Sequence, residues 1–405
     1  MPKKRKISFF GHFGSNNFGN EGTLEAILWN LRRLLPEAEF TCICTDPASA
    51  TLIHNIKASA ISHPLKPSRL KNRTACLFRR VFVRIPRELY HWWEVFVSLK
   101  GTDALIIPGT GLLTDAFGVL SWGPYNLFKW SVLAKSRGCK LFFVSVGAGP
   151  LDGRLSRLLV TLSLSLAEFR SYRDTSSLEY LKNIGFSRTH DRVFPDLAFS
   201  LPKSAVSLDS KKGGRRPVAG LGLMSYGSMY GDNKPTDANY NEYLESFVGL
   251  AKWLLDRGYD IRLIIGELAD PQTEFRRLLH DHLVQYEPSR IVDSSTKSVD
   301  VQLLLAQIAD TDLVVATRFH NVLYALLNNK PTISISFHNK CAALMSVTGL
   351  SEYCLNVSGL KVDAMIDKVC DIEKNSDKLK SLIARRAQQF REELQEQYEI
   401  ITKHL

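Results

Sequence analysis

Apolar strands that run into glycine-rich turns and then into helices recur along this chain, and no other feature restricts its fold as strongly. Within residues 6–14, KISFFGHFG, the predicted strand ends at Gly11. A helix is expected to begin near Asn20 and Glu21. Continuous apolar runs such as 103–115 and 140–150 are typical of parallel strands covered on both faces. The pattern predicts an α/β fold built on open, mostly parallel sheets. Further strands are expected at 40–46, 168–174, 192–201, 218–225, 260–266, 311–319, 331–337 and 353–357.

The same pattern starts again after a polar segment near the middle of the chain. Residues 202–217 have proline at both ends and contain Gly213 and Gly214, which is typical of a linker. The two halves predict two Rossmann-like domains that face each other across a cleft. The predicted parts are an N-terminal domain over 1–202, a linker over 203–216, a C-terminal domain over 217–375 and a C-terminal helix over 376–405, with Ser376 as its N-cap.

Parallel sheets bind ligands beyond the carboxyl ends of their strands, so we expect the functional site at the strand–helix junctions. Glycine there lets backbone N–H groups approach a ligand, and a following helix N-terminus adds partial positive charge. Each glycine taken alone is equally well explained by turn geometry. The candidate substrate-binding residues in the first half are Asn16, Asn17, Asn20, Glu21, Gly109, Gly111, Asp115, Gly147, Gly149, Asp174 and Asp196.

The first junction, GHFGSNNFGNEG (11–22), contains neither the G-x-G-x-x-G pattern of dinucleotide sites nor the lysine pattern of a P-loop. Its asparagines and Glu21 supply hydrogen-bond donors and acceptors that suit the hydroxyls of a sugar. The alternative is that Asn20 is an N-cap and the other asparagines form turns.

Two arginines and a histidine carry the main chemical hypothesis. Arg173 and Arg318 each end a predicted strand, one in each half, and a guanidinium binds a carboxylate or phosphate in a bidentate manner. Together they could hold a ligand with two anionic groups, although Arg173 could instead pair with Asp174. His320 could exchange protons at neutral pH as a catalytic residue, or it could be a structural histidine.

Smaller indications surround this centre. His338 and Lys340 follow the next strand, where Lys340 is either a phosphate ligand or a solvated residue at a helix start. Asp115 and Asp196 could bind sugar hydroxyls, and Asp196 could instead cap a turn. The sequence contains none of the spacings typical of metal sites, and we expect neither a metal nor a cofactor.

The charge balance points to anionic partners. The chain has a net charge of +11, and residues 64–94 hold eight Lys or Arg against two Glu. In that segment arginines alternate with apolar residues and Trp92 and Trp93 follow, so it could lie on an anionic membrane surface that carries a lipid-linked acceptor. The alternative is an ordinary solvated helix with some core contacts.

The seven cysteines are widely spaced, which is typical of thiols in a reducing compartment. No apolar run reaches the roughly 20 residues needed to cross a bilayer, and the basic start lacks the features of a secretory signal. We therefore expect a cytoplasmic protein that can lie at the inner face of the membrane.

The order of the motifs resembles the polysaccharide pyruvyl transferase family. The resemblance rests on GSNNFGNEGTLEAIL, DALIIPGTGLLTD, VSVGAGPLDGRLSRLL, EFRSYRDTSSLEYLKNIG, FPDLAFSL and ATRFHNVLYALLNNKP, and it covers roughly residues 7–360. The first loop departs from the family's G-N-x-G-D-E and reads FGNEG here. The resemblance implies a glycosyltransferase B-like fold and transfer of pyruvate from phosphoenolpyruvate to two hydroxyls of a sugar as a cyclic ketal, in polysaccharide biosynthesis of the cell envelope.

The residues suit this chemistry, and two other functions remain open at this point. Phosphoenolpyruvate carries a carboxylate and a phosphate, which match two arginines, and its methylene carbon needs a general acid, for which we favour His320. A nucleotide-sugar-dependent glycosyltransferase would share the fold and could use Glu267 on the ribose. A nucleic-acid-binding protein would suit the charge, but no nucleic-acid-binding motif is present and we expect no such partner.

Overall fold

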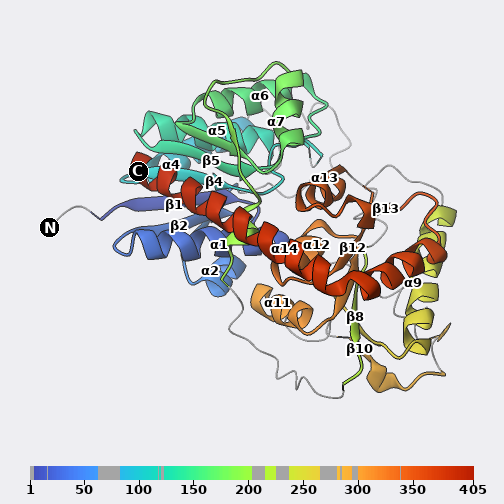
Figure 1. Ribbon diagram of the computed structural model, residues 1–405. Coiled ribbons are helices and arrows are strands. Elements are labelled where there is room, and N and C mark those ends of the chain that lie inside the picture. Colours follow the sequence, from blue (N-terminus) through green and yellow to red (C-terminus); the bar gives the residue numbers. More distant parts are fainter. Residues whose placement is uncertain are drawn as a thin grey trace. The chain divides into compact units, whose positions relative to one another are not determined.

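The chain forms two compact units, each an α/β body with one parallel sheet (Figure 1). The first comprises residues 1–15, 23–200 and 393–405, and the second comprises 16–22 and 201–392. The predicted linker lies mostly outside the described residues. The computed structural model describes residues 4–15, 17–62, 83–116, 118–119, 123–202, 215–224, 237–264, 281–282, 285–293, 300–337 and 339–405.

The sheet of the first unit has the strand order β3-β2-β1-β4-β5-β6-β7, and every pairing is parallel. β1 and β4 are neighbours although two strands lie between them in the sequence, so the direction of the chain through the sheet reverses there. The central strands are buried along nearly their whole length, as their apolar runs predict. The strands are β1 (Lys6–Gly11), β2 (Glu39–Cys44), β3 (Lys57–Ala60), β4 (Ala104–Pro108), β5 (Lys140–Val146), β6 (Phe169–Tyr172) and β7 (Arg192–Val193).

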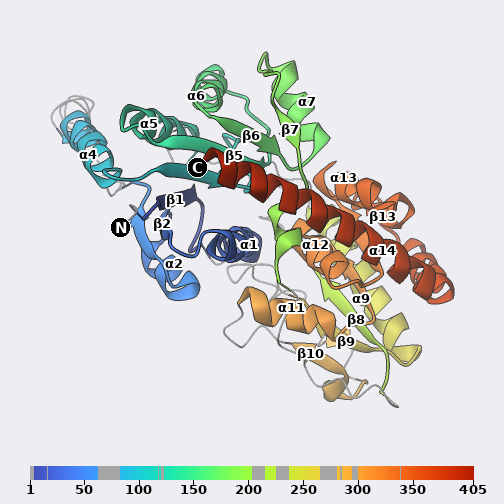
Figure 2. The ribbon, with the colours of Figure 1, turned by 60° about the vertical axis from the view of Figure 1, so that its left-hand side comes forward.

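Helices cover both faces of this sheet, because right-handed crossovers on either side of β1 lead to opposite faces. Figure 2 shows α4, α5 and α6 side by side on one face, with α1 and α2 on the other. The helices are α1 (Phe18–Leu34), α2 (Pro47–His54), α4 (Ile85–Ser98), α5 (Pro124–Ser136), α6 (Arg154–Ser165) and α7 (Thr175–Asn183), with the 3-10 turn η2 (Leu197–Ser200).

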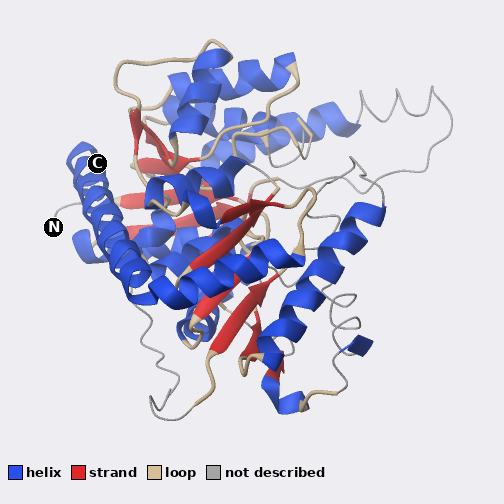
Figure 3. Cartoon of the chain, turned by 45° about the vertical axis from the view of Figure 1, so that its right-hand side comes forward, coloured by secondary structure: helices blue, strands red, loops and turns tan. Residues whose placement is uncertain are grey.

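The second unit repeats the arrangement with the strand order β10-β9-β8-β11-β12-β13, again all parallel. Its strands alternate with helices, as Figure 3 shows by colour. The strands are β8 (Val218–Gly222), β9 (Asp260–Leu263), β10 (Ile291–Asp293), β11 (Leu313–Ala316), β12 (Thr332–Ser336) and β13 (Cys354–Asn356), and the helices are α9 (Asp237–Asp256), η3 (Pro288–Arg290), α11 (Val301–Ala309), α12 (Phe319–Leu327), α13 (Asn339–Thr348), η4 (Ser351–Tyr353) and α14 (Val362–His404).

The C-terminal helix is longer than predicted. The sequence suggested a start at Ser376, but α14 begins at Val362 and passes through that serine. Residues 362–375 contain neither glycine nor proline, and Met365, Val369 and Ile372 are buried at helical spacing. A serine within a helix costs only a few tenths of a kcal/mol relative to better helix formers, so it does not end the helix. Two parallel α/β sheets and a long C-terminal helix are confirmed.

One strand prediction was wrong, and two strands were not predicted. The predicted strand 192–201 is only β7, after which Pro195 interrupts pairing and η2 follows. The prediction also missed β3 and β10, because a short polar edge strand such as KASA gives almost no periodic signal.

The last turns of α14 belong to the first unit and enter its core through polar contacts. Gln397 is fully buried, and its Oε1 accepts a hydrogen bond from Ser171 Oγ at 2.8 Å while its Nε2 donates to Ser145 Oγ at 2.9 Å. Tyr398 lies next to it, and its hydroxyl shares a 2.9 Å hydrogen bond with Ser200. Buried polar groups are costly unless paired, so these contacts specify how the helix end packs.

Replacing Gln397 by alanine should lower the free energy of unfolding by about 1–3 kcal/mol, because two buried hydroxyls lose their partner. Denaturant titration measures this difference. The control is Gln388→Ala, which removes an exposed contact to Glu392 and should stay within about 0.5 kcal/mol of wild type. Equal effects of the two substitutions would contradict the account.

Candidate functional site

The carboxyl end of β11 in the second unit is the strongest candidate site. Strand order reverses between β8 and β11, and ligands of open α/β sheets bind at such a switch point. Arg318 follows β11 and is the N-cap of α12, but its side chain does not cap the helix. The helix N-terminus therefore combines partial positive charge with a largely buried guanidinium, and both features suit an anion.

His320 lies in the first turn of α12 and packs against the first glycine-rich loop of the chain. A Cβ atom at Gly19 would overlap the imidazole, so only glycine allows this approach. The Phe319 ring also meets the imidazole edge to face, with 5.0 Å between ring centres. The surroundings therefore hold the orientation of the imidazole, as a catalytic proton donor requires.

Tyr324, one turn further along α12, fastens the same segment, whose residues 18–22 form the start of α1. Its hydroxyl donates a 2.7 Å hydrogen bond to the carbonyl of Phe18, and a Cβ atom at Gly22 would overlap that hydroxyl. Two segments predicted separately as site candidates, 16–22 and 317–321, thus lie together in the second unit.

Asn321 is a site residue that the sequence analysis did not single out. It is fully buried, and neither its amide nitrogen nor its amide oxygen has a hydrogen-bond partner in the described part of the chain. It packs at the end of β8, where a Cβ atom at Gly222 would lie 2.8 Å from its Nδ2. An unpaired buried amide costs roughly 1–3 kcal/mol. Its place between Arg318 and the switch point could have suggested it, because asparagine is a poor choice for an apolar helix face.

Asn17 caps the start of α1. Asn17 Oδ1 accepts hydrogen bonds from the N–H groups of Gly19 at 3.1 Å and Asn20 at 3.4 Å. The helix therefore begins at Phe18, two residues earlier than predicted, and Asn17 takes the capping role expected of Asn20. Glu21 is buried in the first turn of α1. Asn16 lies outside the described residues.

The glycines of the first unit make close packing contacts. A Cβ atom at Gly109 would lie 2.5 Å from the Ser145 carbonyl oxygen, and one at Gly147 would lie 2.8 Å from Arg173 Nε. Gly149 has a φ of +95°, which favours glycine, and its N–H donates to the Leu113 carbonyl at 2.8 Å. Gly111 lies half-buried in the bend after β4. These contacts explain most of the glycines without a ligand, and ligand binding by them stays a prediction.

Arg173 is paired with carboxylates, as the alternative interpretation of the sequence described. Its side chain is 5% exposed and lies 3.5 Å from Asp174 Oδ2 and 3.4 Å from Asp196 Oδ2. Asp174 also caps α7 by accepting the Ser177 N–H at 2.6 Å, and Asp196 accepts the Ala198 N–H at 3.1 Å. The joint action of Arg173 and Arg318 on one ligand stays a prediction.

Asp115 holds the loop that follows β5. Its carboxylate accepts the N–H groups of Asp152 at 3.1 Å and Gly153 at 2.9 Å. Partial burial raises the pKa of this carboxyl, but the two N–H donors lower it by more, so the pKa lies below its ordinary value. This role is structural, and sugar binding by Asp115 stays a prediction.

Three residues named in the sequence analysis remain. Lys340 is exposed in the first turn of α13. His338 and Glu267 lie outside the described residues.

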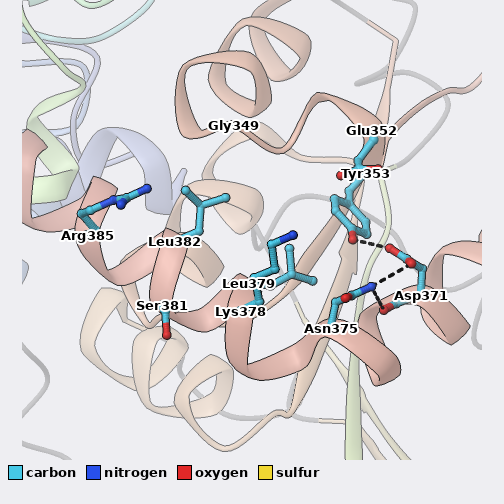
Figure 4. A pocket seen from close by; sticks show the side chains of 10 residues that line it. All are labelled: Gly349, Glu352, Tyr353, Asp371, Asn375, Lys378, Leu379, Ser381, Leu382 and Arg385. Carbon is cyan, nitrogen blue, oxygen red and sulfur yellow. Dashed lines mark hydrogen bonds between the residues drawn. The ribbon is translucent and has the colours of Figure 1, made fainter.

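A cavity of about 620 Å³ lies elsewhere in the second unit (Figure 4). In it Asn375 Nδ2 donates to Asp371 Oδ1 at 2.9 Å, and the Tyr353 hydroxyl donates to the same carboxylate. Tyr353 directly precedes β13, so the cavity lies at the amino end of the strands, opposite the edge that carries Arg318. We therefore do not assign the functional site to it.

Comparison with known proteins supports one family and one fold. The family model for polysaccharide pyruvyl transferase matches residues 17–339. HepE from Anabaena in complex with UDP is similar with a TM-score of 0.59 and 12% identity, over 99% of this chain and 100% of that chain. The UDP-GlcNAc 2-epimerase from Neisseria meningitidis bound to UDP-GlcNAc is similar with a TM-score of 0.58 and 10% identity, over 97% of this chain and 100% of that chain. A glycosyltransferase from Rickettsia africae is similar with a TM-score of 0.58 and 10% identity, over 99% of this chain and 98% of that chain. These structures confirm the predicted glycosyltransferase B-like fold.

Replacing Tyr324 by phenylalanine should loosen the first loop, because the bond to the Phe18 carbonyl is lost. Loss of about 1 kcal/mol corresponds to about fivefold faster hydrogen exchange of the amides in residues 18–22. Mass spectrometry of exchanged peptides measures this. The control, Tyr243→Phe, removes a hydroxyl that pairs with Thr317 Oγ1 at 2.8 Å and should leave loop exchange unchanged. Unaltered exchange in the Tyr324 variant would show that the hydroxyl does not hold the loop.

Replacing Asp115 by asparagine should lower the melting temperature at pH 7 and have less effect in acid. A carboxyl whose pKa is lower in the folded than in the unfolded state stabilises the fold at any pH above its unfolded pKa, which is near 4. This stabilisation is lost as the pH falls through the folded pKa. The exposure of this carboxyl limits the effect to about 0.5–1 kcal/mol. Thermal melts between pH 7 and about pH 3 measure it, with the exposed Asp152→Asn as control. A difference that persists unchanged in acid would contradict the assignment.

Proposed function

This chain belongs to the polysaccharide pyruvyl transferase family, and we propose that it moves pyruvate from phosphoenolpyruvate onto two hydroxyls of a sugar as a cyclic ketal. The family match supports a transferase that modifies polysaccharides. The specific donor and the ketal product are the proposal.

The observation that carries the proposal is the anion site at the start of α12. Phosphoenolpyruvate has a carboxylate and a phosphate attached to the same carbon atom. The Arg318 guanidinium and the N–H groups of the first turn can bind one of them, and the buried amide of Asn321 supplies a further donor. Binding would also give that amide the partner that it lacks among the described residues.

His320 is then placed to act on the donor carbon atoms. Protonation of the methylene carbon by the imidazolium turns it into a methyl group and leaves an oxocarbenium ion at the neighbouring carbon. One sugar hydroxyl bonds to that carbon and returns its proton to His320. The carbon–oxygen bond to phosphate breaks, and the second hydroxyl closes the ketal while its proton leaves with the phosphate. A general acid of this kind contributes typically 10²–10⁴-fold to the rate.

Arg318 rather than Arg173 is the principal donor ligand in this proposal. Two carboxylates beside Arg173 already balance its charge and would repel a dianion at the same place. Arg173 then serves to hold Asp174 and Asp196, while Lys340 remains a candidate second cation for the phosphate. The sugar acceptor is expected to contact the loop at Asn20 and Glu21.

A nucleotide-sugar-dependent glycosyltransferase is the second candidate function. It is favoured by the fold similarity to HepE in complex with UDP. Fold similarity at 12% sequence identity carries less weight than the family match, so phosphoenolpyruvate remains the first proposed donor.

Replacing Arg318 by alanine should weaken phosphoenolpyruvate binding at least about tenfold, because a charge-assisted contact is lost. Replacing His320 by asparagine should leave this affinity nearly unchanged and lower turnover about 10²–10⁴-fold. Isothermal titration calorimetry measures binding, and mass spectrometry of candidate sugar acceptors measures the gain of a pyruvyl ketal.

The matched control is Arg188→Ala, an exposed arginine of the first unit that contacts Ser165 and should behave as wild type. Binding of a UDP-sugar but not phosphoenolpyruvate by the wild-type protein would favour the second candidate. Full turnover in the His320 variant would reject its catalytic role.

A further inference from the structure

Helix α4 presents an exposed apolar face. Ile85, Leu89, Trp93 and Val97 recur every four residues and therefore form one stripe along the helix. Leu89 is 66% exposed and Trp93 is 61% exposed, and Tyr90 lies beside them at 60%. A contiguous apolar stripe of this kind on a soluble domain marks an interaction site more often than chance exposure does.

The opposite face of α4 is fixed to α5, so the exposed stripe has a defined direction. Lys129 of α5 is 1% exposed, and its Nζ donates to Glu88 Oε1 at 2.8 Å. It also lies 2.9 Å from His91 Nδ1, while the Tyr125 hydroxyl donates to Glu88 at 2.8 Å. The negative charge of Glu88 is thus held toward α5 and is balanced there.

Helix α6 adds a second exposed apolar stripe on the same face of the sheet. Leu155, Leu158 and Leu162 are all exposed at helical spacing. α5 packs between α4 and α6, and Figure 2 shows the three helices side by side. The two stripes therefore belong to one side of the first unit.

Basic residues flank both stripes. Arg84 and Arg87 are exposed at the start of α4, and Arg154 and Arg157 are exposed at the start of α6. The exposed acidic residues near them are Glu94 and Asp152. Exposed arginines thus outnumber exposed carboxylates here, in a chain whose net charge is +11.

From these observations we infer that the α4–α6 side of the first unit docks onto an anionic lipid bilayer. Tryptophan, tyrosine and leucine on one face of a helix insert at the boundary between headgroups and acyl chains, and neighbouring arginines bind anionic headgroups. The docking is peripheral, since no helix within the described residues has both the length and the apolar composition for a membrane span. It is independent of the proposed reaction. The part of the basic segment at 64–82 lies outside the described residues and is not needed for the argument.

Vesicle flotation with the full chain tests this inference. The protein should float with vesicles that contain phosphatidylglycerol and much less with phosphatidylcholine alone, and added salt should weaken the binding. Leu89→Ser combined with Trp93→Ser should reduce the floated fraction about tenfold. Charge reversal by Arg84→Glu and Arg87→Glu should abolish the preference for anionic vesicles.

The matched control is Val347→Ser, which alters an exposed apolar residue of α13 in the second unit and should leave flotation unchanged. Circular dichroism checks that each variant is folded, as expected for substitutions at exposed positions. The inference is overturned if the wild type does not float with anionic vesicles, or if the Leu89 and Trp93 double variant floats equally well. Light scattering that shows a dimer abolished by that variant, without lipid binding, would assign the face to a second copy.

Discussion

The hydrogen bond from the Tyr324 hydroxyl to the Phe18 carbonyl is the contact on which the candidate site depends. It holds the start of α1 against α12, and Gly19 and Gly22 lack the side chains that would prevent this approach. His320 is thereby enclosed between the loop and the Phe319 ring. Without this contact the imidazole, Arg318 and the helix N-terminus would remain, but the start of α1 would lose a hydrogen bond that holds it beside them.

The sequence was sufficient to predict two parallel sheets, and it also indicated where in them the site is expected. Continuous apolar runs ending in glycine predict parallel strands, and the carboxyl-end rule then selects Arg318 and His320. It could not reveal the Tyr324 contact, because that bond joins residues 306 positions apart. Asn321 was missed for a related reason: its importance lies in being buried without a partner among the described residues, and burial of a polar side chain follows from packing.

Arg173 and Asp115 show how the same residue types can serve the scaffold instead. Arg173 lies between two carboxylates, and Asp115 binds two backbone N–H groups of a loop. A buried charge must be compensated, and in these two cases neighbouring protein groups supply the compensation. Arg318 lies at the N-terminus of α12, where the partial positive charge of the helix favours an anion.

The account's central claim is that the first turn of α12 binds the anionic donor. Nuclear magnetic resonance of isotopically labelled protein tests it most directly, because backbone amide signals of Phe319, His320 and Asn321 report on an anion bound at their N–H groups. Titration with phosphoenolpyruvate should shift these three signals in a saturable manner. Saturable shifts confined to other parts of the chain, with these amides unmoved, would contradict the claim.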